Sequence, residues 1–568
     1  MSNPLDPGNW PAGEYQRLLA DQHLLRSEAG YAKGRNGAVA VAYGGLAARA
    51  GLEALKVGGN AIDAALTTAM MQVCITGGGP VSYFGIQSLV YYEAGTRQVH
   101  CMNAEWNTVL GEHDPMSIPG GIDMTSLQAL RGTGPASGRT AMVGGFMKGV
   151  GAAHARFGKL PFPCLFQPSI HAAENGIPVT AGTAEMLALR TEDLARLPET
   201  RATLKKVDGS DYVEGDTLKQ PALAKTLRAI AENGTDYMYK GPWAEKLVAA
   251  VQADGGKMTL EDLGRYDVIW AEPLVGQVDG YEIHTSPAPN GGGLALIEAQ
   301  LLARAAGLHE RAHWTESGHT LRDMVTVAQM LFLNYLPEEA RSQLYPGLEF
   351  TQKARLDPAH ASELWKRMDA GALPFQFASP MHSDDVVVID SEGNIAAITH
   401  SSNNVMWGRT GINIDGISIS DSAAHQQPLI ARVTPGDRLP APTETGIVFK
   451  DGEPVLGFAS MGAGLHHRTL QGLLNFTAYG KSLRESVDTA DFFGCGVDPK
   501  TGEVTLHVPK GRFSPAVLRE SGVRFVEIDS EGARFGSEGI WIGISRDPAT
   551  GELQAVSHNR NNSAAFAY

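Results

Sequence analysis

Apolar and polar positions come in blocks along the chain, and one clear pair of blocks predicts a β-hairpin near residue 390. Residues 386–389 form one apolar run and 395–400 form a second, with the turn sequence 390–394 between them. Two such runs joined by a Gly-containing turn are typical of a hairpin. The same kind of pattern predicts further strands at 39–42, 86–93, 99–103, 275–284, 446–450, 455–459, 504–508, 524–528, 539–544 and 553–557.

Helical spacing is most informative at 61–74, where almost every residue is apolar and Asn60 with Asp63 forms an N-cap pair. A helix that is apolar on all sides is normally buried between layers. Because helices and strands are mixed without regular βαβ winding, we expect a layered α+β fold. Other helices are predicted at 44–56, 142–155, 164–174, 220–230, 243–252, 294–306, 320–333 and 466–476, and 358–382 has the composition of an exposed connector.

Composition narrows the class of protein. Hydrophobic residues make up 43% and charged residues 19% of the 568 positions, which is typical of a globular chain. The net charge of −15, without a basic cluster, argues against a nucleic-acid partner. The apolar runs are too short to span a membrane, and the N-terminal residues show no signal-peptide pattern. We therefore expect a cytoplasmic enzyme with neither a nucleic-acid nor a membrane partner.

The cysteines support a reducing compartment. They are far apart in the chain and form no C-x-x-C motif, so a zinc ribbon or a thioredoxin-like site is not indicated. We expect reduced and mostly buried thiols at Cys74, Cys101, Cys164 and Cys495.

Several stretches share one set of family motifs. Residues 57–65 read V-G-G-N-A-I-D-A-A, and 220–241 run from Q-P-A-L-A-K-T-L to Y-K-G. Together with 258–263, 287–293 and 383–403, these stretches resemble the gamma-glutamyltransferase family of N-terminal-nucleophile hydrolases. The resemblance covers most of residues 37–480 and implies a four-layer αββα sandwich with the hairpin in a central position.

The family resemblance implies a precursor that cuts itself between His382 and Ser383. The fragments 1–382 and 383–568 would then form a heterodimer, interleaved in one αββα domain. The new N-terminal Ser383 would supply both the nucleophilic hydroxyl and, through its α-amine, the general base. The family usually has Thr-Thr-His where this chain has Ser383-Asp384-Asp385. A carboxylate at 384 is expected to favour the charged amine and weaken it as a base.

Supporting residues are carried over by the same resemblance. Ser401 and Asn403 match the family's hydroxyl and amide positions, and the turn at Gly462-Ala463 matches its oxyanion hole before the helix at 466–476. Structural alternatives stay open at this point, because 401–404 also has the pattern of a polar loop and 462–464 that of a helix-capping turn.

Departures from the family concern the substrate. The arginine with which the family binds the glutamyl α-carboxylate is absent from the matching string Ala104-Glu105-Trp106. The pair of serines that precedes the family's oxyanion turn is replaced by residues 441–442. The family's acidic residue that holds the substrate α-amine has no clear counterpart near His425. We therefore expect a small-molecule amide other than glutathione as the substrate. Trp106 and Trp407 are candidate apolar walls, and Arg409 is a candidate contact for an acidic substrate.

Two rival interpretations remain. His466-His467 with Asp384-Asp385 would suit a metallohydrolase, but the spacing matches no known ligand pattern and adjacent helical histidines diverge by about 100°. A non-catalytic, unprocessed homologue that acts as a binding or structural protein is the other alternative. The preferred function is a self-processing amide hydrolase or acyltransferase without a metal or another cofactor; hydrolysis versus transfer and further dimerisation are left open.

Overall fold

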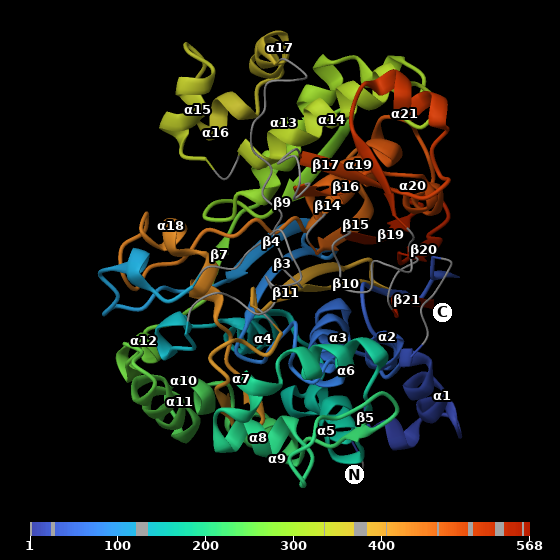
Figure 1. Ribbon diagram of the computed structural model, residues 1–568. Helices are drawn as coiled ribbons and strands as arrows, with labels where there is room; N and C mark the ends of the chain where they lie inside the picture. The colour runs from blue at the N-terminus through green and yellow to red at the C-terminus, as the bar shows by residue number, and fades with distance from the viewer. Residues whose placement is uncertain are drawn as a thin grey trace.

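Two stacked antiparallel sheets form the centre of the computed structural model, and helices cover both outer faces (Figure 1). The predicted α+β, four-layer αββα sandwich is confirmed. Both sheets contain strands from either side of residue 383. The structure describes residues 3–23, 29–120, 135–333, 336–368, 383–404, 406–462, 465–497, 504–528, 539–558 and 562–568.

The first sheet carries the predicted hairpin in its middle. β10 pairs with β11 on one side and with β2 on the other, and both hairpin strands are buried along their whole length. Such central strands can be apolar on both faces, as the sequence pattern indicated. The strand order is β21 (Ala564–Ala567), β2 (Gly37–Val41), β10 (Ser383–Asp390), β11 (Ile395–Ser401), β3 (Ile86–Glu93), β4 (Gln98–Ala104) and β7 (Ile269–Ala271).

The second sheet lies over the first and shares an apolar layer with it. Val387 and Ile395 of the hairpin belong to this layer, as do Ile447 and Ile542 of the second sheet. A side chain at Gly457 would collide with Val387 and Ile395, so the second sheet approaches the hairpin closely at this glycine. The strand order is β1 (Tyr31–Gly34), β20 (Leu553–Val556), β19 (Ile540–Arg546), β15 (Glu453–Met461), β14 (Gly446–Lys450), β9 (Tyr281–Thr285) and β8 (Leu274–Val278).

Helices pack on the two outer faces because each presents an apolar side to a sheet. The completely buried α3 (Ala61–Ile75), with α2 (Gly45–Lys56), α4 (Phe146–Phe157) and α5 (Gln167–Asn175), covers the first sheet. The second sheet is covered by α13 (Gly292–Ala305), α14 (Gly318–Leu333) and α19 (Leu465–Thr477). None of the helices in the described ranges has the length and apolar character needed to cross a bilayer.

Shorter elements complete the described chain. The helices are α1 (Glu14–Ala20), α6 (Ala181–Leu189), α7 (Thr191–Ala195), α8 (Pro198–Leu204), α9 (Pro221–Asn233), α10 (Asp236–Tyr239), α11 (Pro242–Ala253), α12 (Leu260–Gly264), α15 (Glu338–Leu344), α16 (Gln352–Arg355), α17 (Pro358–Arg367), α18 (Gln427–Ile430), α20 (Leu483–Asp488) and α21 (Pro515–Ser521). The strands are β5 (Ile177–Pro178), β6 (Thr217–Leu218), β12 (Asn413–Ile414), β13 (Ile417–Ser418), β16 (Phe493–Val497), β17 (Val504–Pro509) and β18 (Phe525–Ile528).

Two predicted elements differ from the structure. The single strand expected at 275–284 is two strands, β8 and β9, because Asp279 and Gly280 adopt positive φ angles of 54° and 81° and turn the chain back. The connector expected at 358–382 begins with helix α17, which the Asp357 side chain caps and Pro358 opens. The remainder of that segment, 369–382, lies outside the described residues.

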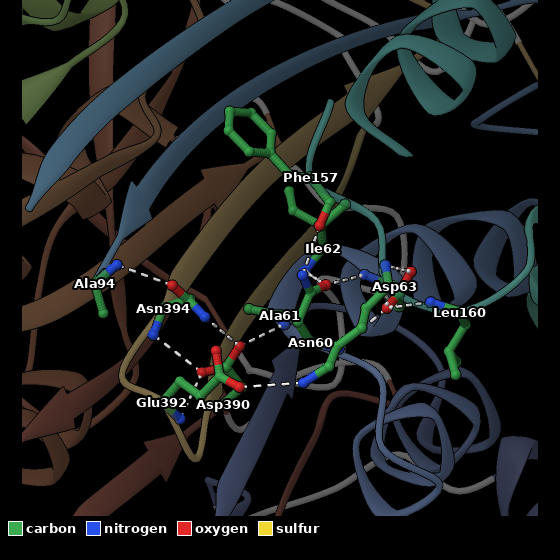
Figure 2. A network of polar contacts seen from close by, with 11 residues as sticks. Asn60, Ala61, Ile62, Asp63, Ala94, Phe157, Leu160, Asp390, Glu392 and Asn394 are labelled. Atoms are coloured by element: carbon green, nitrogen blue, oxygen red, sulfur yellow. Dashed lines mark hydrogen bonds and ion pairs between the residues drawn. The ribbon is translucent and has the colours of Figure 1, made fainter. Parts of the chain in front are cut away.

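The N-terminal family motif holds α3 to the hairpin turn (Figure 2). Asn60 and Asp63 form a reciprocal capping box, and Asp63 also accepts the backbone N–H groups of Lys159 and Leu160. Asp390 accepts the N–H of Ala61 at 2.9 Å. These contacts fix the end of β10 that is distant from Ser383, so this motif stabilises the scaffold and does not line the site.

Candidate active site

Ser383 is the first residue of β10 and lies opposite Ser401, the last residue of β11. Strand alternation puts the side chains of Ser383 and Asp385 on the same face as Val387, which belongs to the layer between the sheets. Ser383 is 8% exposed. The predicted nucleophile and its predicted hydroxyl neighbour are therefore brought together at one end of the inter-sheet layer.

The glycine turn of the second sheet lies at this same end. The close approach of Gly457 to Val387 sets β15 over the hairpin. The hydroxyl groups of Thr443, just before β14, and Ser88, near the start of β3, lie 3.1 Å apart and mark the end of the sandwich where Ser383 is found. Gly446, at the start of β14, pairs with Phe458 in β15. The C-terminal end of β15 and Gly462, which follows it, therefore lie at the same end of the sandwich as Thr443.

Gly462 has the conformation that its predicted role requires. Its φ of 86° is readily adopted by glycine alone, and the α19 helix begins three residues later. A helix N-terminus close to a turn of this kind contributes positive potential for a developing oxyanion. Ala463 and His382 lie outside the described residues, and their roles stay predictions.

Asn403 is oriented by Trp106. The Trp106 indole N–H donates to Asn403 Oδ1 at 3.0 Å, and the Asn403 backbone N–H donates to Ser401 Oγ at 3.0 Å. Since an indole nitrogen is a donor only, this contact identifies the amide oxygen of Asn403 and directs its NH₂ group away from the indole. Asn403 also has a φ of 42°, which asparagine tolerates better than most residues. Trp106 thus contacts the candidate site through a hydrogen bond, while its ring packs in a separate apolar cluster with Ile86 and Met142.

The Asp384-Asp385 pair is fully enclosed. Asp384 Oδ1 accepts Gln72 Nε2 at 2.6 Å, and Asp385 Oδ1 accepts the Thr399 hydroxyl at 2.6 Å. Burial raises the pKa of both carboxyl groups well above the usual range, and the charge of Asp385 raises the pKa of Asp384 further. The raised pKa favours the neutral form of Asp384 and so reduces the negative charge expected beside the Ser383 amine.

A polar row crosses the first sheet beside Ser383. The strand registers place Asp385 opposite Thr399, Thr399 opposite Ser88, and Ser88 opposite Asn103. Ser88 Oγ donates to Glu105 Oε1 at 2.5 Å. This row continues the Ser383 end of the sheet toward β4 with hydroxyl, amide and carboxyl groups.

Residues of the second sheet close this polar cluster from above. Asn290 Nδ2 donates to Ser88 Oγ and to Thr443 Oγ1, each at 2.9 Å. Asn290 comes from the loop after β9, and a side chain at Gly292 would collide with the backbone of Pro442. The sequence analysis identified the loop 287–293 as a family motif, but no sequence pattern predicted that Asn290 would contact Ser88.

Burial raises the pKa of Glu105 to about 7, while the Ser88 hydrogen bond and the charge of Arg438 lower it in part. In the string Ala104-Glu105-Trp106, Ala104 stands in place of the family's arginine, and Glu105 keeps the carboxyl group that follows it. Ala104 itself is buried in the layer between the first sheet and its helices.

Trp407 has other surroundings than predicted, whereas the contact of Arg409 with an acidic substrate stays a prediction. The Trp407 indole is buried in the helix-side core and donates its N–H to the carbonyl of Gly77 at 2.8 Å. The backbone N–H of Arg409 donates to Asp421 Oδ2 at 2.8 Å. Neither contact joins these residues to Ser383, Ser401 or Asn403, so the structure gives Trp407 a packing role.

The histidines of the rival metal hypothesis do not meet the acid pair. His466 Nδ1 is hydrogen-bonded to Glu444, on the helix side of the second sheet, whereas Asp384 contacts Gln72 of α3. Within the described ranges, no group of three or more His, Cys, Asp or Glu side chains is arranged to hold a metal ion.

The αββα fold, with a hydroxyl residue at the head of a central strand and a glycine turn above it, defines an N-terminal-nucleophile hydrolase. The solved structure described as cephalosporin acylase from Bacillus halodurans has the same fold, with a TM-score of 0.75 and 22% identity, over 95% of this chain and 97% of that one.

The chain belongs to the gamma-glutamyltranspeptidase family, whose model matches residues 47–568. A relative named glutathione hydrolase proenzyme, from Bacillus subtilis (strain 168), is 28% identical over 94% of this chain and 92% of its own length. Another, named acylase ACY 1 proenzyme, from Pseudomonas sp. (strain SE83), is 26% identical over 78% of this chain and 80% of its own. The protein is thus an enzyme of the amide hydrolase and acyltransferase class, and the non-catalytic alternative is not supported.

Proposed function

We propose that this protein hydrolyses its own His382–Ser383 peptide bond and then uses Ser383 as an N-terminal nucleophile on a small-molecule amide. The observation that carries the proposal is the position of Ser383: at the head of a central strand, opposite Ser401 and at the Gly462 end of the sandwich. The products of the cut would be the fragments 1–382 and 383–568, which stay together as a heterodimer because both sheets contain strands of each.

The mechanism follows from the groups at this end of the layer. The Ser383 hydroxyl attacks the substrate carbonyl and its proton passes to the Ser383 α-amine, which protonates the departing amine. The backbone of the turn at Gly462 and the Asn403 amide would stabilise the oxyanion. Water or a second amine then releases the acyl group and restores the free hydroxyl.

The substrate proposed is an amide other than glutathione. Where the family binds the glutamyl α-carboxylate with an arginine, this chain has the buried methyl group of Ala104. The acylase names of two relatives support an acyl amide, and the glutathione hydrolase relatives make glutathione the necessary comparison substrate. A reducing compartment also stays a proposal; it is supported by the unpaired thiols of Cys74 and Cys101.

The decisive experiment is mass spectrometry with N-terminal sequencing of purified wild type, Ser383→Ala, Ser383→Thr and Ser391→Ala. Ser391 is an exposed serine at the other end of the same hairpin and is the matched control. We expect two fragments from wild type, Ser383→Thr and Ser391→Ala, with the residue at position 383 as the new N-terminus in each case. Ser383→Ala should stay intact.

A screen of amide substrates on the processed protein completes the test. We expect turnover of at least one non-glutamyl amide and an acyl adduct on the 383–568 fragment. An intact chain that is nevertheless active would refute the role of Ser383. Efficient release of glutamate from glutathione would refute the proposed substrate class while leaving the nucleophile in place.

A further inference from the structure

Asp385 has one carboxyl oxygen that the described part of the chain leaves without a hydrogen-bond partner. The residue is fully buried, and its Oδ1 accepts the Thr399 hydroxyl at 2.6 Å, whereas its Oδ2 is buried and unpaired. Its backbone is fixed in the middle of the first sheet, because β10 pairs with a strand on each side. Buried polar atoms of native proteins are almost always paired, so this oxygen indicates the position of a bound group.

The unpaired oxygen lies on the face of the sheet that carries the Ser383 hydroxyl. Ser383 is opposite Ser401, and the next pair on the same face is Asp385 with Thr399. Asp384, which lies between them in the sequence, points to the opposite face and contacts α3. No side chain of the hairpin therefore separates the proposed nucleophile from the Asp385 carboxyl group.

The spacing of the two side chains suits one water molecule between them. Two residues along an antiparallel strand cover about 6.8 Å, and two O–H···O hydrogen bonds in series cover about 5.6 Å. The aspartate side chain is longer than that of serine and leans along the strand, which accounts for the difference. Ser383 is 8% exposed, so solvent reaches this end of the layer. Buried waters typically occupy such positions between polar groups that lack another partner.

The chemical state of Asp385 sets the direction of these hydrogen bonds. Burial raises its pKa well above the usual range, and the Thr399 hydroxyl lowers it only in part. The favoured neutral acid has one O–H donor, which is at Oδ2 because Oδ1 accepts from Thr399. A water that accepts this proton can donate one of its own hydrogens to Ser383 Oγ. The hydroxyl proton of Ser383 is then left for its α-amine, whereas an ionised carboxylate would compete for that proton.

We propose that Asp385 is a positioning residue for Ser383: its carboxyl O–H binds a buried water, and this water donates a hydrogen bond to the Ser383 hydroxyl oxygen. The water fixes the rotamer of the serine side chain and directs its proton to the α-amine. This inference rests on the proposed function, because it takes Ser383 as the nucleophile.

The test measures the reactivity of Ser383 with a reagent that does not depend on the unidentified substrate. Processed wild type, Asp385→Asn and Asp385→Leu are treated with phenylmethanesulfonyl fluoride, and mass spectrometry follows the adduct on the 383–568 fragment. In this reaction the Ser383 oxygen displaces fluoride from sulfur, and the hydroxyl proton passes to the α-amine. Asparagine keeps an acceptor for Thr399 and an N–H donor in place of Oδ2, so its rate should stay within about threefold of wild type.

Leucine has a similar volume but no donor, and Asp385→Leu should lower the maximal rate of modification about tenfold or more. The apparent affinity for the reagent should stay within about threefold, because only the orientation of the hydroxyl changes. Asp390→Asn is the matched control, since Asp390 is a buried acid at the far end of the same strand, and its rate should equal that of wild type.

Two further measurements cover a variant that is not processed or does not fold. Self-cleavage of the precursor uses the same hydroxyl and should be slower in Asp385→Leu than in Asp385→Asn. A crystal structure of processed wild type should show a water within about 3.2 Å of both Asp385 Oδ2 and Ser383 Oγ.

Separate outcomes refute the Asp385 assignment and the proposed function. Equal rates in the Asn and Leu variants, or the absence of that water from clear electron density, would overturn the role of Asp385 and leave Ser383 as the nucleophile. If wild type neither cuts itself nor forms the adduct, the proposed function fails, and the Asp385 assignment fails with it.

Discussion

Replacing Trp106 by Phe tests whether Asn403 is positioned by the indole. The Trp106 side chain is 2% exposed and donates to Asn403 Oδ1 at 3.0 Å. Phenylalanine keeps an aromatic ring in this apolar surrounding but leaves the buried amide oxygen without its donor. An unsatisfied buried acceptor costs about 1–3 kcal/mol. If about 1–2 kcal/mol of this cost is added to the activation free energy, kcat/KM falls roughly 5- to 30-fold.

A double-mutant cycle on the processed enzyme measures this coupling. Trp106→Phe, Asn403→Ala and the double variant are compared by kcat and KM on one amide substrate, with fragment masses confirming processing. We expect Trp106→Phe to have little further effect once Asn403 is Ala. Trp243→Phe is the matched control, because that indole is equally buried and donates to the backbone carbonyl of Ile414 at 3.1 Å. Fully additive losses, or an equal loss in the control, would refute the reasoning.

Two further predictions concern stability. Asp390→Ala should lower the free energy of unfolding, measured by urea denaturation, by about 2–4 kcal/mol. The reason is that the N–H of Ala61 and the side chain of Asn394 lose a buried acceptor. A loss below about 1 kcal/mol would contradict this account. Asp384 has a raised pKa in the fold, so its contribution is complete below the unfolded pKa of about 3.9 and is lost as pH rises toward the folded pKa. Asp384→Asn keeps an oxygen that accepts from Gln72 but removes the titrating group. The urea concentration at the unfolding midpoint should therefore fall less steeply in the variant than in wild type as the pH rises from about 4 to 8. The same dependence on pH in both proteins would show that Asp384 does not have a raised pKa in the fold.

Local signals were sufficient for the scaffold around Ser383. The apolar runs and their Gly-containing turn predicted the hairpin, because alternation and turn chemistry act between near neighbours. Asn60 and Asp63 predicted the start of α3, since a capping box is closed within one helical turn. The class of fold followed from family motifs, and the family model confirmed it.

The surroundings of the site needed the tertiary structure. The sequence predicted Trp407 as a substrate wall, but a left-handed φ of 62° and the Gly77 carbonyl place its indole in the core. It predicted a charged Asp384, but burial under α3 raises the pKa of that carboxyl group. Burial and orientation depend on which distant segments pack together, and no local pattern records that.

By itself, the sequence determined the hairpin, the serine at its head and the family to which the chain belongs. Only the tertiary structure decided which groups meet at that end of the first sheet: Trp106 is hydrogen-bonded to Asn403, and Glu105 is hydrogen-bonded to Ser88. The physical reason is that a hydrogen-bond partner and the degree of burial are set by contacts between strands far apart in the chain. Those contacts form only when β3, β4 and β11 pair side by side in the first sheet.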